Sequence, residues 1–340
     1  MVDKKNIFRI GIDKISLYNF SLKTNREFQK LTDYKENCVK EKVIITDELF
    51  SIVNSYVVYQ DNNKLEETLF NKITFNPNKI LTGDNVCNTS VKELATALEK
   101  LKNVLKDKEI EIDFSEARIA DIELNLNVPI DFNEYSEVFM LFFRQLNKSK
   151  KISAIVDSDS LSTSTIDEDY FSRINKSVTF KIYSKDREKN LDFKVTRLEY
   201  FLEYASYKYT MGRYNLDNTL KDLLDSNGVI EDIFITRTKK DFILKSMSYI
   251  EKRIKIVLER EYIAFKKANA LAKRNGRKER RNVYKYLEKF WVFDYSFLIE
   301  LVEKYNSKNK GREIKRVIQD FSQHDNLKKL NYLLEYIIPH

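Results

Sequence analysis

The chain has 340 residues, and its 60 basic and 52 acidic side chains give a net charge of +8 at pH 7. A hydrophobic content of 42% is sufficient for a folded core, and the length favours two domains. The two cysteines, Cys38 and Cys87, lack the spacing of metal ligands and argue against a disulfide framework, which favours a reducing, cytoplasmic compartment. Neither a signal-peptide pattern nor a run of about 20 apolar residues occurs, so secretion and membrane insertion are not expected.

The first part of the chain predicts strands followed by a helix. Apolar and polar residues alternate over residues 7–20, 51–60 and, more weakly, 72–81, which predicts three strands. A helix is expected after Ser90, because Ser90 and Glu93 have the spacing of a capping box. This order of elements predicts an α+β fold built on an antiparallel sheet.

A further strand is predicted at the end of residues 109–128, and it has an acidic face. Asp121, Glu123 and Asn125 lie on one side of it, while the intervening residues are apolar. Acidic residues are poor strand formers, so two of them on one face need a reason. Either this face of the sheet is exposed to solvent or it binds a cation, and the alternation alone supports both interpretations.

Residues 178–203 predict two strands joined by a charged turn. Polar residues gather around that turn as a Y-x-K-x-x-E motif and a following R-x-E motif, namely Tyr183, Lys185, Glu188, Arg197 and Glu199. A tyrosine beside a lysine and several carboxylates can act as the nucleophile of a DNA-nicking transesterase. The chain has 20 tyrosines, so ordinary packing of Tyr183 is the alternative interpretation.

A short internal repeat links these two regions. Residues 114–119 and 193–198 share the pattern Phe-x-x-x-Arg followed by an apolar residue, and each opens a strand that carries acids. Residues 72–81 would then correspond to 177–185. The repeat predicts two similar α+β halves placed around one site.

The net charge and the predicted secondary structure of the chain change after residue 230. Residues 231–340 hold 26 Lys and Arg against 15 Asp and Glu, a net charge of +11, and because the whole chain carries +8, residues 1–230 carry −3. A long helix is predicted over residues 239–273 and ends at Asn275-Gly276. Four short helices are predicted at 284–291, 295–305, 313–321 and 326–338.

This distribution predicts a catalytic α+β domain over residues 1–228 and an all-α, basic, DNA-binding region over residues 229–340. An ordinary helical bundle with solvated charges is the alternative for the second region. The candidate DNA contacts cluster around the predicted helix break: Lys273, Arg274, Arg277, Lys278, Arg280 and Arg281.

Several classes of chemistry are excluded by what the sequence lacks. There is no G-x-x-x-x-G-K-[ST] motif, so no ATPase of the P-loop type is expected. The only histidines are His324 and His340, which excludes a Ser-His-Asp triad or a histidine-bound zinc ion in the first domain. A metal held there must have oxygen ligands, which favours Mg²⁺ or Mn²⁺.

The motifs around the hairpin resemble those of the rolling-circle replication initiators of small plasmids, and of the related relaxases of conjugative elements and replication proteins of phages. The resemblance covers residues 109–209 and fits the branch without a histidine motif. Its motif residues match one by one: Tyr183, Lys185, Glu188, Arg197 and Glu199. An earlier strand of the family is matched by Arg118, Asp121 and Glu123, with one extra residue between the arginine and the first acid.

The resemblance implies a protein that binds an origin, nicks one strand and becomes joined to its 5′ phosphate. Tyr183 would be the nucleophile, Lys185 and Arg197 would position the phosphate, and a Mg²⁺ or Mn²⁺ ion would be held by Asp121, Glu123 and Glu199. The implied partners are DNA, as origin duplex or hairpin and as single strand, and host helicase and polymerase; a homodimer is compatible with it. Two other functions remain open: a non-catalytic origin-binding protein, and a metal-dependent nuclease that activates water.

Overall fold

A computed structural model describes residues 7–24, 29–35, 38–61, 64–136, 138–139, 170–175, 178–239, 245–277, 296–305, parts of 311–319, and 325–337. The chain divides into two compact units. The first comprises Met1–Phe132 and Lys151–Phe234, and the second comprises Asn133–Lys150 and Ile235–His340. The division of labour predicted for residues 1–228 and 229–340 stays a prediction.

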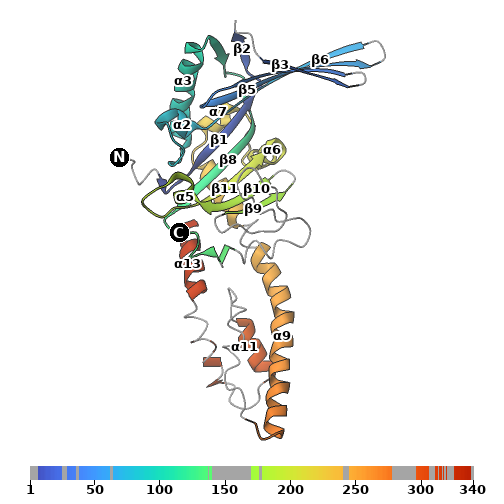
Figure 1. Ribbon diagram of the computed structural model, residues 1–340, viewed down its shortest axis with the longest axis vertical. Helices are drawn as coiled ribbons and strands as arrows, with labels where there is room; N and C mark the ends of the chain where they lie inside the picture. The colour runs from blue at the N-terminus through green and yellow to red at the C-terminus, as the bar shows by residue number, and fades with distance from the viewer. Residues whose placement is uncertain are drawn as a thin grey trace. The chain divides into compact units, whose positions relative to one another are not determined.

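A nine-stranded sheet forms the centre of the first unit (Figure 1), and every strand pair in it is antiparallel. The strand order is β3-β4-β5-β6-β1-β8-β11-β10-β9, and β2 and β7 pair separately. The strands are β1 Ile10–Tyr18, β2 Ser21–Thr24, β3 Gln29–Lys35, β4 Cys38–Thr46, β5 Phe50–Asp61, β6 Lys64–Phe75, β7 Ile110–Asp113, β8 Arg118–Val128, β9 Tyr170–Asn175, β10 Val178–Ser184 and β11 Thr196–Glu203.

The α+β prediction is confirmed, and one strand was predicted with the wrong end. Of the strand expected over 72–81, only the part up to Phe75 is extended, as the end of β6. Asn76 then caps a helix, accepting a hydrogen bond from Lys79 N at 2.8 Å, and Pro77 occupies its first turn. Proline is favoured there because its fixed φ suits a helix and no amide hydrogen is lost.

Helices accompany the sheet in the first unit and form the described part of the second. The capping box predicted at Ser90 and Glu93 is present at the start of α3. The helices are α2 Pro77–Thr82, α3 Val91–Asp107, α5 Lys185–Lys189, α6 Tyr204–Gly212, α7 Leu220–Asp225, α8 Val229–Arg237, α9 Lys245–Arg274, α11 Ser296–Tyr305 and α13 Asp325–Ile337.

One face of the central strands is apolar and lies in the core. Leu124, Leu198 and Ile182 alternate with polar residues along β8, β11 and β10, and all three are buried. Tyr200 on β11 continues this face and packs edge-on against Phe234, with ring centroids 5.7 Å apart. The opposite face of the same strands is therefore the one that carries the polar residues singled out from the sequence.

Helices predicted in the second unit are confirmed where the structure describes them. The long helix is α9, and it is followed by Gly276 in a left-handed conformation with φ of 65°. Helix α11 is tied to α9 by Lys304 Nζ, which lies 2.7 Å from Glu259 Oε1. The helix predicted over 284–291 lies outside the described residues, and that over 313–321 is only partly described. None of the described helices is long and apolar enough to cross a membrane.

Candidate active site

Strand pairing places most of the predicted site residues on one face of the sheet. Tyr183 on β10 lies opposite Arg197 on β11, and Glu199 on β11 lies opposite Asn125 on β8. Paired residues of neighbouring strands point to the same face, so these four side chains are displayed together. Glu123, two residues before Asn125, shares that face.

Glu199 lies at the centre of this cluster and is almost fully buried. The hydroxyl of Tyr183 donates a hydrogen bond to its Oε1, and Lys181 Nζ lies 3.2 Å from its Oε2. Burial disfavours the charged carboxylate, but Lys181, Arg197 and the Tyr183 hydroxyl outweigh burial, so the pKa of Glu199 lies below its usual value. Glu199 is therefore ionised at neutral pH and accepts the hydrogen bond of the Tyr183 hydroxyl.

Tyr183 is held in the protonated state by its surroundings. Burial, followed by the charge of Glu199, raises the pKa of its phenol well above the usual value, and Arg197 opposes this. Lys185 lies beneath it, with Nζ 5.6 Å from the centroid of the Tyr183 ring. Tyr183 can become a nucleophile only by passing its proton to a base, and Glu199 is in contact with that proton.

Lys185 belongs to the charged turn, which folds as the single-turn helix α5. Its ammonium is buried and lies 2.8 Å from Glu188 Oε2, so the Y-x-K-x-x-E spacing brings these two residues together beside the tyrosine. Burial, and then repulsion by Arg197, lowers the pKa of Lys185. A lysine with this surrounding can stabilise negative charge on the phenol or give up a proton.

Arg197 is completely buried, and protein acceptors surround its guanidinium. Nε lies 2.7 Å from Asn127 Oδ1, Nη1 lies 2.8 Å from Asp13 Oδ1, and Nη2 lies 2.8 Å from the carbonyl oxygen of Val86. In this conformation it supplies positive charge to Glu199 and anchors Asp13. The predicted contact between Arg197 and a phosphate would require it to exchange one of these acceptors.

Asp13 belongs to the cluster, although the sequence did not single it out. Ile12 pairs with Leu124 and Lys14 with Glu123, so Asp13 is the extra residue of a β-bulge in β1. Its buried carboxylate accepts hydrogen bonds from Arg197 and, at 3.3 Å, from Asn125 Nδ2. Burial raises the pKa of Asp13, and the charge of Arg197 opposes that effect. The three-residue step between Ile12 and Ile15 in an otherwise alternating strand was the available signal.

Oxygen donors of the kind that Mg²⁺ or Mn²⁺ prefers also converge here. Glu123 Oε1 and Glu199 Oε2 lie 2.6 and 3.2 Å from Lys181 Nζ, so one ammonium bridges both carboxylates. Oδ1 of Asn125, opposite Glu199, is buried without a hydrogen-bond partner. In this structure the Lys181 ammonium lies between the two carboxylates, so binding of a divalent cation stays a prediction.

Asp121, predicted as a third metal ligand, is not part of this cluster. It lies opposite Glu203 on β11 and pairs with Lys72 on β6. Within the part of the chain that the structure describes, no three or more His, Cys, Asp or Glu side chains are arranged to hold a metal ion. The predicted ligands Glu123 and Glu199 are thus brought together, and Asp121 is not.

The predicted DNA contacts of the second unit are exposed where they are described. Lys273 and Arg274 end helix α9, and Arg277 follows Gly276. All three side chains are exposed to solvent. The other candidates, Lys278, Arg280 and Arg281, lie outside the described residues.

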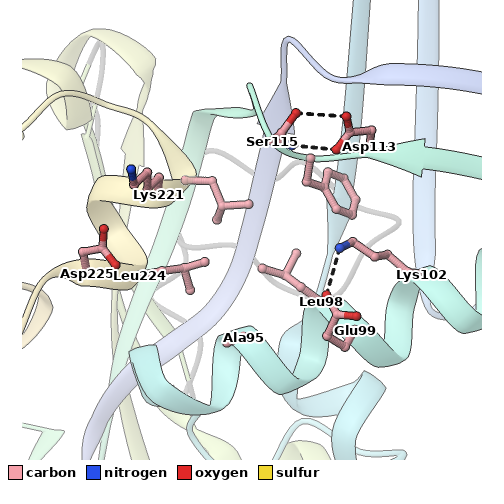
Figure 2. A pocket seen from close by; sticks show the side chains of 11 residues that line it. Ala95, Leu98, Glu99, Lys102, Asp113, Ser115, Lys221, Leu224 and Asp225 are labelled. Atoms are coloured by element: carbon pink, nitrogen blue, oxygen red, sulfur yellow. Dashed lines mark hydrogen bonds and ion pairs between the residues drawn. The ribbon is translucent and has the colours of Figure 1, made fainter.

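A separate pocket of about 450 Å³ lies between α3, the segment after β7, and α7 (Figure 2). Asp113 accepts hydrogen bonds from the Ser115 amide and hydroxyl, at 3.0 and 2.9 Å, and Lys102 lies 2.8 Å from Glu99. None of the residues around Tyr183 lines this pocket. The polar face of the sheet is therefore the candidate active site.

Comparison with known proteins gave likenesses to solved structures alone. No family model matches the chain, and neither does any curated protein. The structure of the rolling circle replication initiator protein from Geobacillus stearothermophilus matches with a TM-score of 0.32 and 12% identity, over 68% of this chain and 84% of that one. A TM-score of 0.32 is too low to show a common fold.

Proposed function

We propose that the protein is a DNA strand-nicking and strand-joining transesterase that acts as a rolling-circle replication initiator, with Tyr183 as nucleophile. The observation that carries this proposal is the hydrogen bond from the Tyr183 hydroxyl to the buried, ionised Glu199. A hydroxyl nucleophile in contact with its base is the arrangement that covalent catalysis requires. The resemblance of the Y-x-K-x-x-E and R-x-E motifs to those of replication initiators points to DNA as the substrate.

The proposed reaction conserves the phosphodiester bond energy. The phenol oxygen of Tyr183 bonds to phosphorus, the bond to the 3′ oxygen breaks, and the Tyr183 proton passes to Glu199. The departing 3′ oxygen takes up a proton from solvent water, Glu199 later releases its proton to solvent, and the 5′ phosphate stays on the tyrosine. Attack by a 3′ hydroxyl on the phosphotyrosine reverses these steps and joins a strand.

The remaining charges around Tyr183 have supporting roles. Lys185, below the ring, stabilises negative charge that develops on the phenol oxygen. Arg197 keeps Glu199 ionised and holds Asp13 in place. A Mg²⁺ or Mn²⁺ ion bound by Glu123, Glu199 and Asn125 would polarise the phosphodiester.

The exposed basic side chains at the end of α9 are proposed to bind duplex DNA. Lys273, Arg274 and Arg277 belong to the second unit, and their proposed role is to hold the DNA while the residues around Tyr183 cut it. Such contacts involve mainly phosphates and weaken steeply with salt.

A covalent-adduct assay tests the proposal. Single-stranded DNA labelled at its 3′ end is incubated with the full chain and Mg²⁺ or Mn²⁺, and the products are separated on a denaturing protein gel. The label must be at the 3′ end because the 5′ phosphate of the downstream fragment remains on the protein. A labelled protein band is expected, and it should disappear in excess chelator.

Other outcomes would identify the alternatives. Cleavage without a labelled protein band would indicate a nuclease that activates water. Binding without cleavage, on any DNA tested including hairpins, would indicate a non-catalytic DNA-binding protein.

A further inference from the structure

The strand register relates the two halves of the sheet by an approximate two-fold axis. At its centre Glu123 on β8 lies opposite Phe201 on β11. Glu199 lies two residues before Phe201 on β11, and Asp121 lies two residues before Glu123 on β8. Because the strands are antiparallel, these two acids lie on opposite sides of the central pair. Exchanging the two antiparallel strands therefore exchanges Asp121 with Glu199.

The same exchange relates the neighbouring strands, β1 and β10. Arg118 lies opposite Tyr18 on β1, as Arg197 lies opposite Tyr183 on β10. Ala120 is left without a partner between Ile119 and Asp121, so the extra residue in the first copy of the motif is a bulge. The repeat seen in the sequence is therefore real, but β1 and not β6 is the counterpart of β10.

The first copy of the repeat, called the Tyr18 copy, contains a tyrosine and an arginine, as the Tyr183 copy does, but these residues have different contacts. Asn218 Nδ2 donates to the Tyr18 hydroxyl at 3.3 Å, and Arg118 Nη1 donates to Asn218 Oδ1 at 3.3 Å. Asp121, the counterpart of Glu199, pairs with Lys72. An amide donates to the Tyr18 hydroxyl, whereas the Tyr183 hydroxyl donates to the Glu199 carboxylate, so the surroundings of Tyr18 favour binding over cutting.

Tyr18 supports a second tyrosine that is open to solvent. The Tyr204 ring, at the start of α6, packs edge-on against Tyr18 with centroids 5.8 Å apart, and 41% of Tyr204 is exposed. Lys208, one turn further along α6, places Nζ 5.8 Å from the centroid of the Tyr204 ring. The hydrogen bond with Tyr18, followed by the charge of Lys208, lowers the pKa of Tyr204.

An exposed aromatic ring beside a cation, as Tyr204 lies beside Lys208, is typical of surfaces that bind single-stranded nucleic acid. Bases stack on such rings whatever their identity, and nearby cations neutralise the adjoining phosphates. Strands lie about 4.8 Å apart and rise about 3.3 Å per residue, so three strand spacings and roughly eight residues place Tyr18 about 30 Å from Tyr183. A single strand of several nucleotides can span that distance along one face of the sheet.

We propose that Tyr18, Arg118, Tyr204 and Lys208 form a second DNA site, which holds the single strand beyond the nicking site by stacking a base on Tyr204 and neutralising a phosphate with Arg118 and Lys208. This inference rests on the proposed function, which supplies the single-stranded DNA. It assigns a role to the first copy of the internal repeat: one copy cuts the strand and the other holds it.

The test is equilibrium binding of a fluorescent single strand of about 16 nucleotides to the full chain, with Tyr183→Phe as the common background so that no strand is cut. Tyr204→Ala should weaken binding about tenfold, and Tyr204→Trp, which retains the stacking surface, should not. Tyr209→Ala is the matched control, because Tyr209 lies on the same helix with 68% exposure and is expected to leave affinity unchanged. Lys208→Ala should lower the slope of log affinity against log salt by about 0.7.

A strand of the same length with abasic sugars separates stacking from charge. Tyr204→Ala should leave its binding unchanged, because that strand has no bases to stack. Equal effects of Tyr204→Ala and Tyr209→Ala on the normal strand, or an equal loss on the abasic strand, would overturn the proposal. The binding result is independent of the adduct assay, so a failure of nicking and a failure of the second site are distinguished.

Discussion

At the scale of single residues, the proposed reaction requires a carboxylate that accepts the Tyr183 proton. Glu199 is the carboxylate that contacts the hydroxyl, and its charge is maintained by Lys181 and Arg197 despite burial. Glu123 also contacts Lys181, but at Glu123 the effects that raise the pKa outweigh those that lower it. Burial, and then repulsion by Glu199, raises the pKa of Glu123 to about 7. Two neighbouring carboxylates with different pKa values are typical of sites that move protons.

Glu199→Gln should abolish proton acceptance while preserving the shape of the side chain. Adduct formation in a single turnover should slow by about 10² to 10⁴-fold, the usual contribution of a general base. Glu203→Gln is the control, since Glu203 lies on the same strand but is exposed. Similar rates for the Glu199→Gln variant and the unmodified chain would show that another group takes the proton.

The raised pKa of Glu123 predicts a pH dependence of stability. The folded chain holds this proton up to about pH 7, whereas the unfolded chain loses it near 4.5. Between these values the unfolded state binds fewer protons, so the free energy of unfolding should fall as pH rises. Urea titrations in metal-free buffer at several pH values measure this fall, and Glu123→Gln should reduce it. An unchanged slope in the variant would assign the titration to another group.

At the scale of elements, sequence patterns located most of the strands and helices but not their irregularities. Alternation identified β1, β5, β8 and the β10–β11 hairpin, and the capping box identified α3. Asp13 was missed because a bulge, which a plain alternating pattern does not describe, turns its side chain into the site. Asp121 was predicted as a ligand because it shares a face with Glu123. In the structure its carboxylate pairs with Lys72, a contact that depends on the pairing of strands distant in the sequence and that the sequence pattern did not reveal.

The position of β1, and with it Asp13, depends on the close approach of Gly11 to a loop. A Cβ at Gly11 would lie 2.8 Å from the carbonyl oxygen of Thr89, and Ile12 N donates to that same oxygen at 2.8 Å. Gly11→Ala should therefore lower the free energy of unfolding by about 1–3 kcal/mol, measured by urea titration. Gly212→Ala is the control: a Cβ at Gly212 meets nothing within 4 Å, so that change should be neutral or slightly stabilising. Equal stability of the two variants would contradict this account of β1.

At the scale of the whole molecule, the uneven charge predicts that binding and cutting are separable. The chain carries +11 over residues 231–340 and −3 before them, and the exposed cations at the end of α9 lie in the second unit. The charge difference was visible in the sequence. The sequence did not show that residues 133–150 belong to the second unit, because contacts between residues do not follow chain order.

Replacing Lys273, Arg274 and Arg277 by alanine in the full chain tests this separation. The slope of log affinity for duplex DNA against log salt should become shallower by up to about 0.9 for each side chain that contacts a phosphate. Extending the replacement to Lys278, Arg280 and Arg281 should flatten it further. Cleavage of a single strand should be unchanged. A slope that does not move would mean that the duplex binds elsewhere, and a loss of single-strand cleavage would mean that both units contribute to one site.

The central claim is that Tyr183 is the residue that becomes joined to DNA. Digesting the covalent adduct with nuclease and protease and sequencing the modified peptide by mass spectrometry identifies that residue directly. The nucleotide is expected on Tyr183, and Tyr183→Phe, which removes only the phenol oxygen, should bind single-stranded DNA as before and form no adduct. A nucleotide found on Tyr18, Tyr204 or any other residue, or an adduct that persists in the Tyr183→Phe variant, would contradict the assignment of the active site.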